Sequence, residues 1–181
     1  MSYRLPKGSR SGIPLPVTIS VGHEQYTDAR IYADGHVTLP ATAGLDRATN
    51  ECLSFSERSG LALFGWWADL DPVRDDGRVS TFQAGANRFV IEYYGVAMRA
   101  HPGGGNDERL TFQIELYDDW RVRFNYRETP SAGGTPDHAT VGVQRKDGLF
   151  YNEIACVTPD IENGLLPSSY QSLLFRERDQ F

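Results

Sequence analysis

The chain has 181 residues, enough for one domain with a sizeable core, and its 40% hydrophobic and 23% charged residues exclude a disordered, collagen-like or coiled-coil chain. The 18 glycines and 10 prolines are more than a helical bundle tolerates, because both residues interrupt helices. The formal net charge of −6, with no basic cluster, argues against a nucleic-acid partner.

Strand signals recur along the chain from residue 17 onward, with turn residues between them. The segments 25–33 and 36–39 flank Asp34-Gly35, a dipeptide suited to a tight hairpin because glycine accepts positive φ. The run 61–67 is apolar on both faces, which predicts a central strand covered from both sides. Other strands are expected at 17–20, 78–83, 88–94, 110–117, 122–126, 138–143, 149–157 and 170–175.

The clearest alternation lies in 110–117 and resumes in 122–126. Its period of two predicts a hairpin with one apolar and one polar face, and the polar face carries Gln113 and Glu115 against Arg121 and Arg123. We therefore predict an all-β fold: an antiparallel two-sheet β-sandwich of about ten strands with minor helix, as a single domain over 1–181. The predicted core contains Leu110, Phe112, Ile114, Leu116, Val122, Phe124 and either Ile91 or Val90.

Cys52 and Cys156 are the two cysteines, and they lack the C-x-x-C spacing of a metal or redox motif. They predict a disulfide, with two buried free thiols as the alternative. A bond that closes a loop of about 100 residues would stabilise the fold by about 4.7 kcal/mol on the chain-entropy model.

The ends of the chain and its apolar runs bear on the compartment. No run approaches the roughly 20 apolar residues of a membrane-spanning helix, so membrane insertion is not expected. The first eight residues lack the apolar region of a secretory signal. We therefore expect either a cytosolic protein or a segment of a longer precursor.

Several short segments follow one another in a recognisable order: PLPVTISVGHEQY at 14–26, IYADGHVTL at 31–39, LFGWWADLDP at 63–72, RFVIEYYGV at 88–96, LTFQIELY at 110–117, VRFNY at 122–126 and ATVGV at 139–143. Together they resemble the nidogen-like β-sandwich modules, including relatives appended to large secreted bacterial proteases and surface proteins. One departure is the turn Asp118-Asp119-Trp120, which lacks the glycine of the family pattern and implies a different turn.

This resemblance implies a non-catalytic extracellular accessory or interaction module that binds a protein or a glycan at the cell surface. It also implies that the chain is a segment of a larger secreted parent protein, with Met1 as an added start. The alternative is a standalone secreted hydrolase or lectin-like protein with a calcium-assisted acidic site.

The best candidate for a metal site is the acidic run 67–77. Asp69, Asp71, Asp75 and Asp76 bring four carboxylates close together, and Ca²⁺ prefers several oxygen ligands. The spacing departs from the known calcium loop because Val73 takes the third ligand position. A solvated loop, with an Asx-turn and Arg74 as the neutralising partner, is the alternative. No other cofactor is expected.

Catalytic motifs are not recognisable in the sequence. The four histidines, His23, His36, His101 and His138, have no pairwise spacing typical of zinc ligands. Glu92 and Glu115 would suit a glycosidase carboxylate pair, but outward positions on adjacent strands, together with Arg123, favour cross-strand ion pairs. We expect no enzymatic activity.

Exposed aromatic and loop residues are the candidate binding contacts. One of Trp66 and Trp67 should point into the core and the other should cover the opposite face. Trp120 lies at a turn, where it is either exposed for binding or folded over its own hairpin. The glycine-rich stretch 99–107 is expected to be an exposed loop, so His101 and Asn106 join Trp120 as candidate binding residues.

Overall fold

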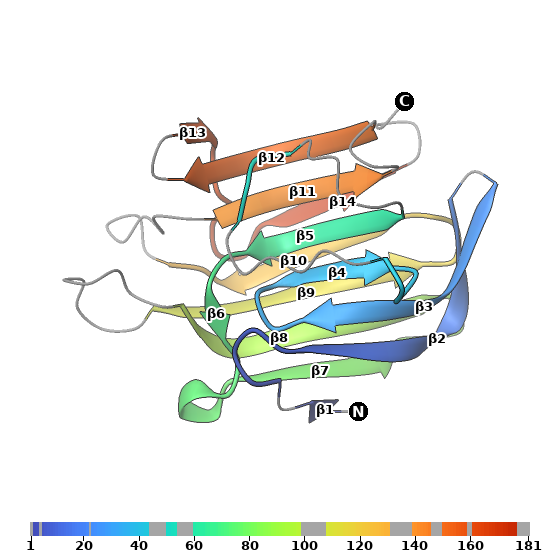
Figure 1. Cartoon of the computed structure of the whole chain (residues 1–181), viewed down its shortest axis with the longest axis horizontal. Coiled ribbons are helices and arrows are strands. Elements are labelled where there is room, and N and C mark those ends of the chain that lie inside the picture. The colour runs from blue at the N-terminus through green and yellow to red at the C-terminus, as the bar shows by residue number, and fades with distance from the viewer. Residues whose placement is uncertain are drawn as a thin grey trace.

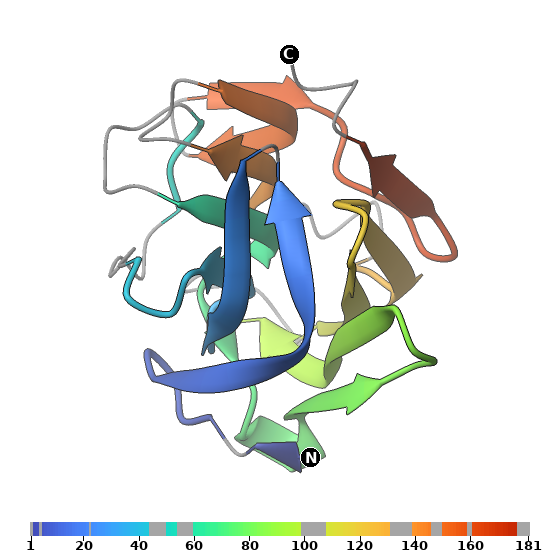
Figure 2. The same ribbon diagram turned by 90° about the vertical axis from the view of Figure 1, so that its right-hand side faces the viewer.

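Two antiparallel seven-stranded sheets, packed face to face, make up the described part of the chain in the computed structural model (Figures 1 and 2). The predicted all-β sandwich is therefore confirmed. The described residues are 2–3, 5–21, 23–43, 50–53, 60–98, 108–130, 139–145, 150–158 and 161–176. Within them the helical part is one short 3-10 turn, η1 (Arg74–Asp76), and no helix is long and apolar enough to cross a membrane.

The first sheet, sheet A, has the strand order β1-β7-β8-β9-β10-β14, and β6 pairs with β8 beside this path. Its strands are β1 (Ser2–Tyr3), β6 (Leu70–Asp71), β7 (Arg78–Gln83), β8 (Arg88–Met98), β9 (Arg109–Tyr117), β10 (Val122–Glu128) and β14 (Ser172–Phe175). The central hairpin β9-β10 is the one predicted from the alternation of apolar and polar residues.

The second sheet, sheet B, has the order β13-β12-β11-β5-β4-β3-β2 and lies in front of sheet A in Figure 1. Its strands are β2 (Arg10–Val21), β3 (Glu24–Tyr32), β4 (His36–Leu39), β5 (Leu61–Trp67), β11 (Ala139–Arg145), β12 (Phe150–Thr158) and β13 (Ile161–Gly164). As expected, β5 is central and almost wholly buried.

The core lies between the sheets and takes one apolar face from each. The six alternating residues predicted from β9 and β10 are all buried in it. Of the two candidates on β8, Ile91 belongs to the core, whereas Val90 is buried on the outer face of sheet A, opposite Glu115. This difference follows from the period of two, which sends adjacent residues to opposite faces.

Two buried tyrosines of sheet A connect the sheets by hydrogen bonds through the core. The hydroxyl of Tyr93 donates to the backbone oxygen of Tyr32 at 2.6 Å, and that of Tyr126 donates to the backbone oxygen of Gly65 at 2.7 Å. Burial raises the pKa of both hydroxyls well above the ordinary value, so they remain donors.

Two glycines are required where the backbone approaches its neighbours. Gly35 has φ +88°, and a Cβ there would lie 2.0 Å from the backbone oxygen of Trp66. This explains the Asp34-Gly35 turn between β3 and β4. A Cβ on Gly65 would lie 2.5 Å from the ring of Phe112, so glycine lets the two sheets meet at that point.

Some strands extend beyond the prediction or were not predicted. β2 starts at Arg10, seven residues before the predicted strand, and includes Pro14 and Pro16. Both prolines are exposed on an edge strand, where a missing N–H is tolerated. β13 and the two-residue strands β1 and β6 were not predicted. The sequence Lys-Asp-Gly at 146–148 also predicts a turn, and it lies outside the described residues.

Candidate functional site

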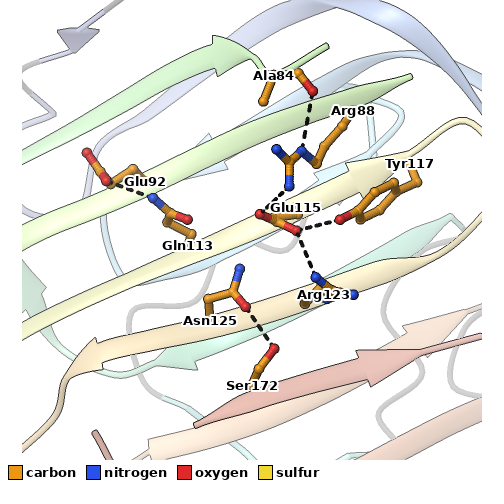
Figure 3. Close-up of polar contacts among 9 residues, drawn as sticks. All are labelled: Ala84, Arg88, Glu92, Gln113, Glu115, Tyr117, Arg123, Asn125 and Ser172. Carbon is orange, nitrogen blue, oxygen red and sulfur yellow. Dashed lines mark hydrogen bonds and ion pairs between the residues drawn. The ribbon is translucent and has the colours of Figure 1, made fainter. Parts of the chain in front are cut away.

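A row of five polar side chains crosses the outer face of sheet A. The strand register aligns them from β7 to β14, and we call this set the polar row: Ser80, Glu92, Gln113, Asn125 and Ser172. The Ser80 hydroxyl donates to Glu92 at 3.3 Å, and the Gln113 amide donates to Glu92 at 2.9 Å. The Ser172 hydroxyl donates to Asn125 at 2.7 Å (Figure 3). Solvent reaches every member of the row.

Glu115 lies beside the polar row and is a buried carboxylate with several donors. It is 5% exposed. Tyr117 donates its hydroxyl hydrogen to Glu115 at 2.7 Å, and Arg88 donates at 3.2 Å (Figure 3). Arg123 lies at 4.0 Å on the opposite side. These groups offset the cost of burying the charge and hold the Glu115 carboxylate in one position on this face.

Arginines stack on tyrosines at both sides of the polar row. The guanidinium of Arg78 lies 4.0 Å from the ring centre of Tyr94. On the other side Arg121 lies 4.5 Å from the ring centre of Tyr117. Cation–π contacts of this kind hold long side chains against the sheet, which leaves the polar row open between them.

These contacts bear on the predicted chemistry of Glu92 and Glu115. The two residues belong to neighbouring rows, and each is bonded to amide, hydroxyl or guanidinium groups of adjacent strands. Cross-strand pairing, which the alternation favoured, accounts for both carboxylates.

The acidic run behaves largely as a turn. Asp69 pairs with Lys7 at 2.8 Å, and Asp71 accepts a hydrogen bond from the Val73 N–H at 3.3 Å in an Asx-turn. Asp76 takes φ 68° at the end of η1. The side chain of Asp75 lies outside the description, so calcium at Asp69, Asp71, Asp75 and Asp76 stays a prediction.

Among the described side chains, one group of three potential metal ligands lies close together: Cys52, Glu153 and Cys156. The two cysteines form a disulfide, as predicted, so their sulfurs are not available as thiolate ligands. Glu153 accepts a hydrogen bond from the Leu53 N–H at 2.6 Å. This group therefore fastens the segment 50–53 to β12.

The segment 50–53 lies over the outer face of sheet B. Leu53 packs on Phe64 and Trp67, which point away from the core, whereas Trp66 points into it. The prediction that the two tryptophans divide between the faces is confirmed. His36 stacks on Tyr32, with ring centres 3.9 Å apart, and lies 3.0 Å from Asp34. His36 is therefore part of this buried outer cluster.

Of the two alternatives for Trp120, the exposed binding contact is wrong. Trp120 is 2% exposed and packs into the core, because the turn places it at φ 69° and its N–H donates to the Tyr117 oxygen. The turn that differs from the family pattern stays a prediction. The other two candidate binding residues, His101 and Asn106, lie outside the described residues.

Sequence reasoning missed two features of the site. The alternation indicated that Gln113, Glu115 and Arg123 face outward, but not which side chains would pair across strands. Tyr170, just before β14, is 88% exposed and was predicted only as the start of a strand. In the sequence, the position of Tyr170 directly after Ser168 and Ser169 is the signal that could have indicated a surface turn.

Comparison with known proteins gives one match. Residues 7–165, most of the chain, match the model of the family described as NIDO related. No curated protein and no solved structure matches the chain.

Proposed function

The chain belongs to the NIDO-related family, and from this premise we propose that it is a non-catalytic extracellular module that binds a protein or a glycan through the outer face of sheet A. The observation that carries the proposal is the polar row. Its side chains are held by hydrogen bonds to one another and are still reached by solvent. A pre-ordered polar surface loses little conformational freedom when a ligand binds.

The disulfide supports the extracellular setting. Disulfides persist in oxidising compartments and are rare in the cytosol. The Cys52–Cys156 bond closes a separation of 104 residues and fastens a covering segment to sheet B. A module that works outside the cell, as one part of a larger secreted chain, gains from such a bond.

The proposal is tested by binding of the fluorescently labelled chain to cell-envelope and extracellular-polymer fractions of the source organism. We expect saturable binding that the double variant Gln113→Ala/Asn125→Ala weakens about tenfold or more, since each lost hydrogen bond contributes about 0.5 to 1.5 kcal/mol. The matched control is Gln25→Ala/Thr27→Ala, which removes two exposed polar side chains from β3 of sheet B.

Equal affinity of the two double variants would overturn the choice of surface. Hydrolysis of a generic peptide or glycoside substrate, lost in Glu92→Gln or Glu115→Gln, would overturn the non-catalytic assignment. In both measurements circular dichroism confirms that each variant is folded.

A further inference from the structure

Charged side chains beside the polar row are already engaged by their neighbours: Glu115 and Asp119 in ion pairs with arginine, and Glu92 by neutral hydrogen-bond donors. Glu115 is bonded to Arg88 and Tyr117, and Glu92 is bonded to Gln113 and Ser80. Asp119 forms an ion pair with Arg121 at 2.9 Å. A strongly charged partner would have to break these pairs. An uncharged ligand that both donates and accepts hydrogen bonds can instead join them.

The polar row also has a regular spacing. Neighbouring strands lie about 4.8 Å apart, so the four spacings from Ser80 to Ser172 span about 19 Å. One spacing is close to the length of one sugar unit in a linear polysaccharide. A glycan chain that crosses the strands therefore meets one polar side chain per sugar unit, over about four to five units.

An exposed tyrosine lies two residues before Ser172, the β14 member of this row. Tyr170 has φ 66°, a backbone region that favours glycine, and its side chain is 88% exposed. Its N–H donates to the backbone oxygen of Tyr126 at 2.7 Å, next to Asn125 of the row. The preceding Ser169 accepts a hydrogen bond from the Thr129 N–H at 3.0 Å.

These bonds hold the turn at Tyr170 in place, but the ring itself buries little surface. Fold stability therefore does not account for a tyrosine at this position, where glycine would relax the backbone. A fixed, solvent-facing tyrosine offers a flat apolar face with a polar tip, which suits stacking against the C–H face of a sugar ring.

From these observations we infer that the polar row and Tyr170 bind an uncharged linear glycan that runs across the strands of sheet A. This inference rests on the proposed function, since it names the ligand class of the same face. The side chains of Glu92, Gln113 and Asn125 bind the sugar hydroxyls, and Tyr170 stacks on a ring at the β14 end. Protein contacts are less suited to this face, because Phe82 is the one exposed large hydrophobic residue among its described strand positions.

The test is calorimetric titration of the chain with unsulfated oligosaccharides of glucose, xylose, mannose and galactose, each from one to about six units. We expect affinity to rise with chain length, to level off at about five units, and to stay constant between roughly 0.05 and 0.5 M salt. Asn125→Ala and Tyr170→Gly should each weaken binding about tenfold. Tyr170→Phe should keep it.

Tyr170→Gly separates binding from stability, because glycine removes the ring and relaxes the backbone. Its melting temperature should match or exceed that of the unaltered chain. The matched control is Tyr151→Ala, which removes a half-exposed tyrosine from β12 of sheet B and should leave binding unchanged.

Three outcomes would overturn the inference. One is full affinity in Tyr170→Gly. Another is binding of sulfated or uronic-acid oligosaccharides alone, with affinity that falls as salt is added. The third is binding to extracellular fractions that is lost in Gln113→Ala/Asn125→Ala but is not reduced by added oligosaccharides or by glycosidase digestion. In that case the proposed function stands, with a protein as the ligand. If the unaltered chain bound neither the oligosaccharides nor the extracellular fractions, both proposals would be overturned.

Discussion

The outer faces of the two sheets differ in how they meet solvent. On sheet B, Phe64 and Trp67 of the central strand are fully buried beneath Leu53. On sheet A, Gln113 and Asn125 of the central strands are only partly buried, and they form side-chain hydrogen bonds across the face (Figure 3). One sheet is covered by the chain itself and the other presents an ordered polar surface.

The difference follows from the strands at the centre of each sheet. β9 and β10 alternate, so one face enters the core and the other carries polar groups. β5 is apolar on both faces and needs a cover, which the segment 50–53 supplies and the disulfide fastens. The covered face should therefore contribute to stability, and the open face to binding.

The largest expected effect separates the two faces directly. Trp67→Ala should lower the free energy of unfolding by about 3 to 5 kcal/mol, because it leaves a cavity under Leu53. The matched change Gln113→Ala on sheet A should alter it by no more than about 0.5 kcal/mol. Urea unfolding measures both, and similar losses from the two variants would contradict the division between the faces.

Removing the disulfide should have the next largest effect. Cys52→Ala/Cys156→Ala should cost about 2 to 4 kcal/mol, because the unfolded chain gains freedom and the cover over sheet B is released. Binding at the outer face of sheet A should persist below the melting temperature of the variant. Loss of binding at a temperature where circular dichroism shows a folded variant would mean that the two faces are coupled.

Within the open face, Glu115 should contribute more to stability than Glu92. Glu115→Ala removes the partner of Arg88 and Arg123 and the acceptor for the Tyr117 hydroxyl, so we expect a loss of about 2 kcal/mol. Glu92→Ala, at a partly buried position, should cost about 0.5 kcal/mol. If chemical denaturation showed a larger loss of unfolding free energy for Glu92→Ala than for Glu115→Ala, the polar row would contribute more to stability than Glu115.

Local patterns were sufficient to predict much of this fold. Asp34-Gly35 indicates a hairpin by itself, because Gly35 adopts a backbone angle that other residues avoid. The alternation in β9 and β10 identified the buried residues one by one. The two-sided apolar pattern of β5 correctly indicated a covered strand, and the two cysteines indicated the bond beside its cover.

Other features depend on contacts between distant segments. β13 is exposed at every position, so no burial pattern marks it, and it is a strand because it pairs with β12. The partners in the polar row depend on the register of five strands, which local sequence does not specify. The turn position of Trp120 left exposure and burial as alternatives, and its ring packs into the core through contacts that local sequence does not specify.

The smallest expected effect concerns the ion pair between Asp119 and Arg121 at the side of the open face, and how its contribution to stability changes with pH. The pKa of Asp119 lies below its ordinary value of 3.8, first because Arg121 donates side-chain hydrogen bonds to it, at 2.9 Å to each carboxylate oxygen. A carboxyl whose pKa is lower in the folded state stabilises the fold above its unfolded pKa, and this contribution is lost as the pH falls through the folded pKa.

Because the Asp119 side chain is 52% exposed, solvent screens the pair, and we expect Asp119→Asn to cost only a few tenths of a kcal/mol at neutral pH. The difference from the unaltered chain should shrink as the pH drops below about 4, because Asp119 of the unfolded chain is protonated first and that of the folded chain follows at its lower pKa. Added salt should reduce it as well. Asp118→Asn is the neighbouring control, since Asp118 acts on Arg121 only through its charge. A difference in melting temperature that grows on acidification would contradict this assignment.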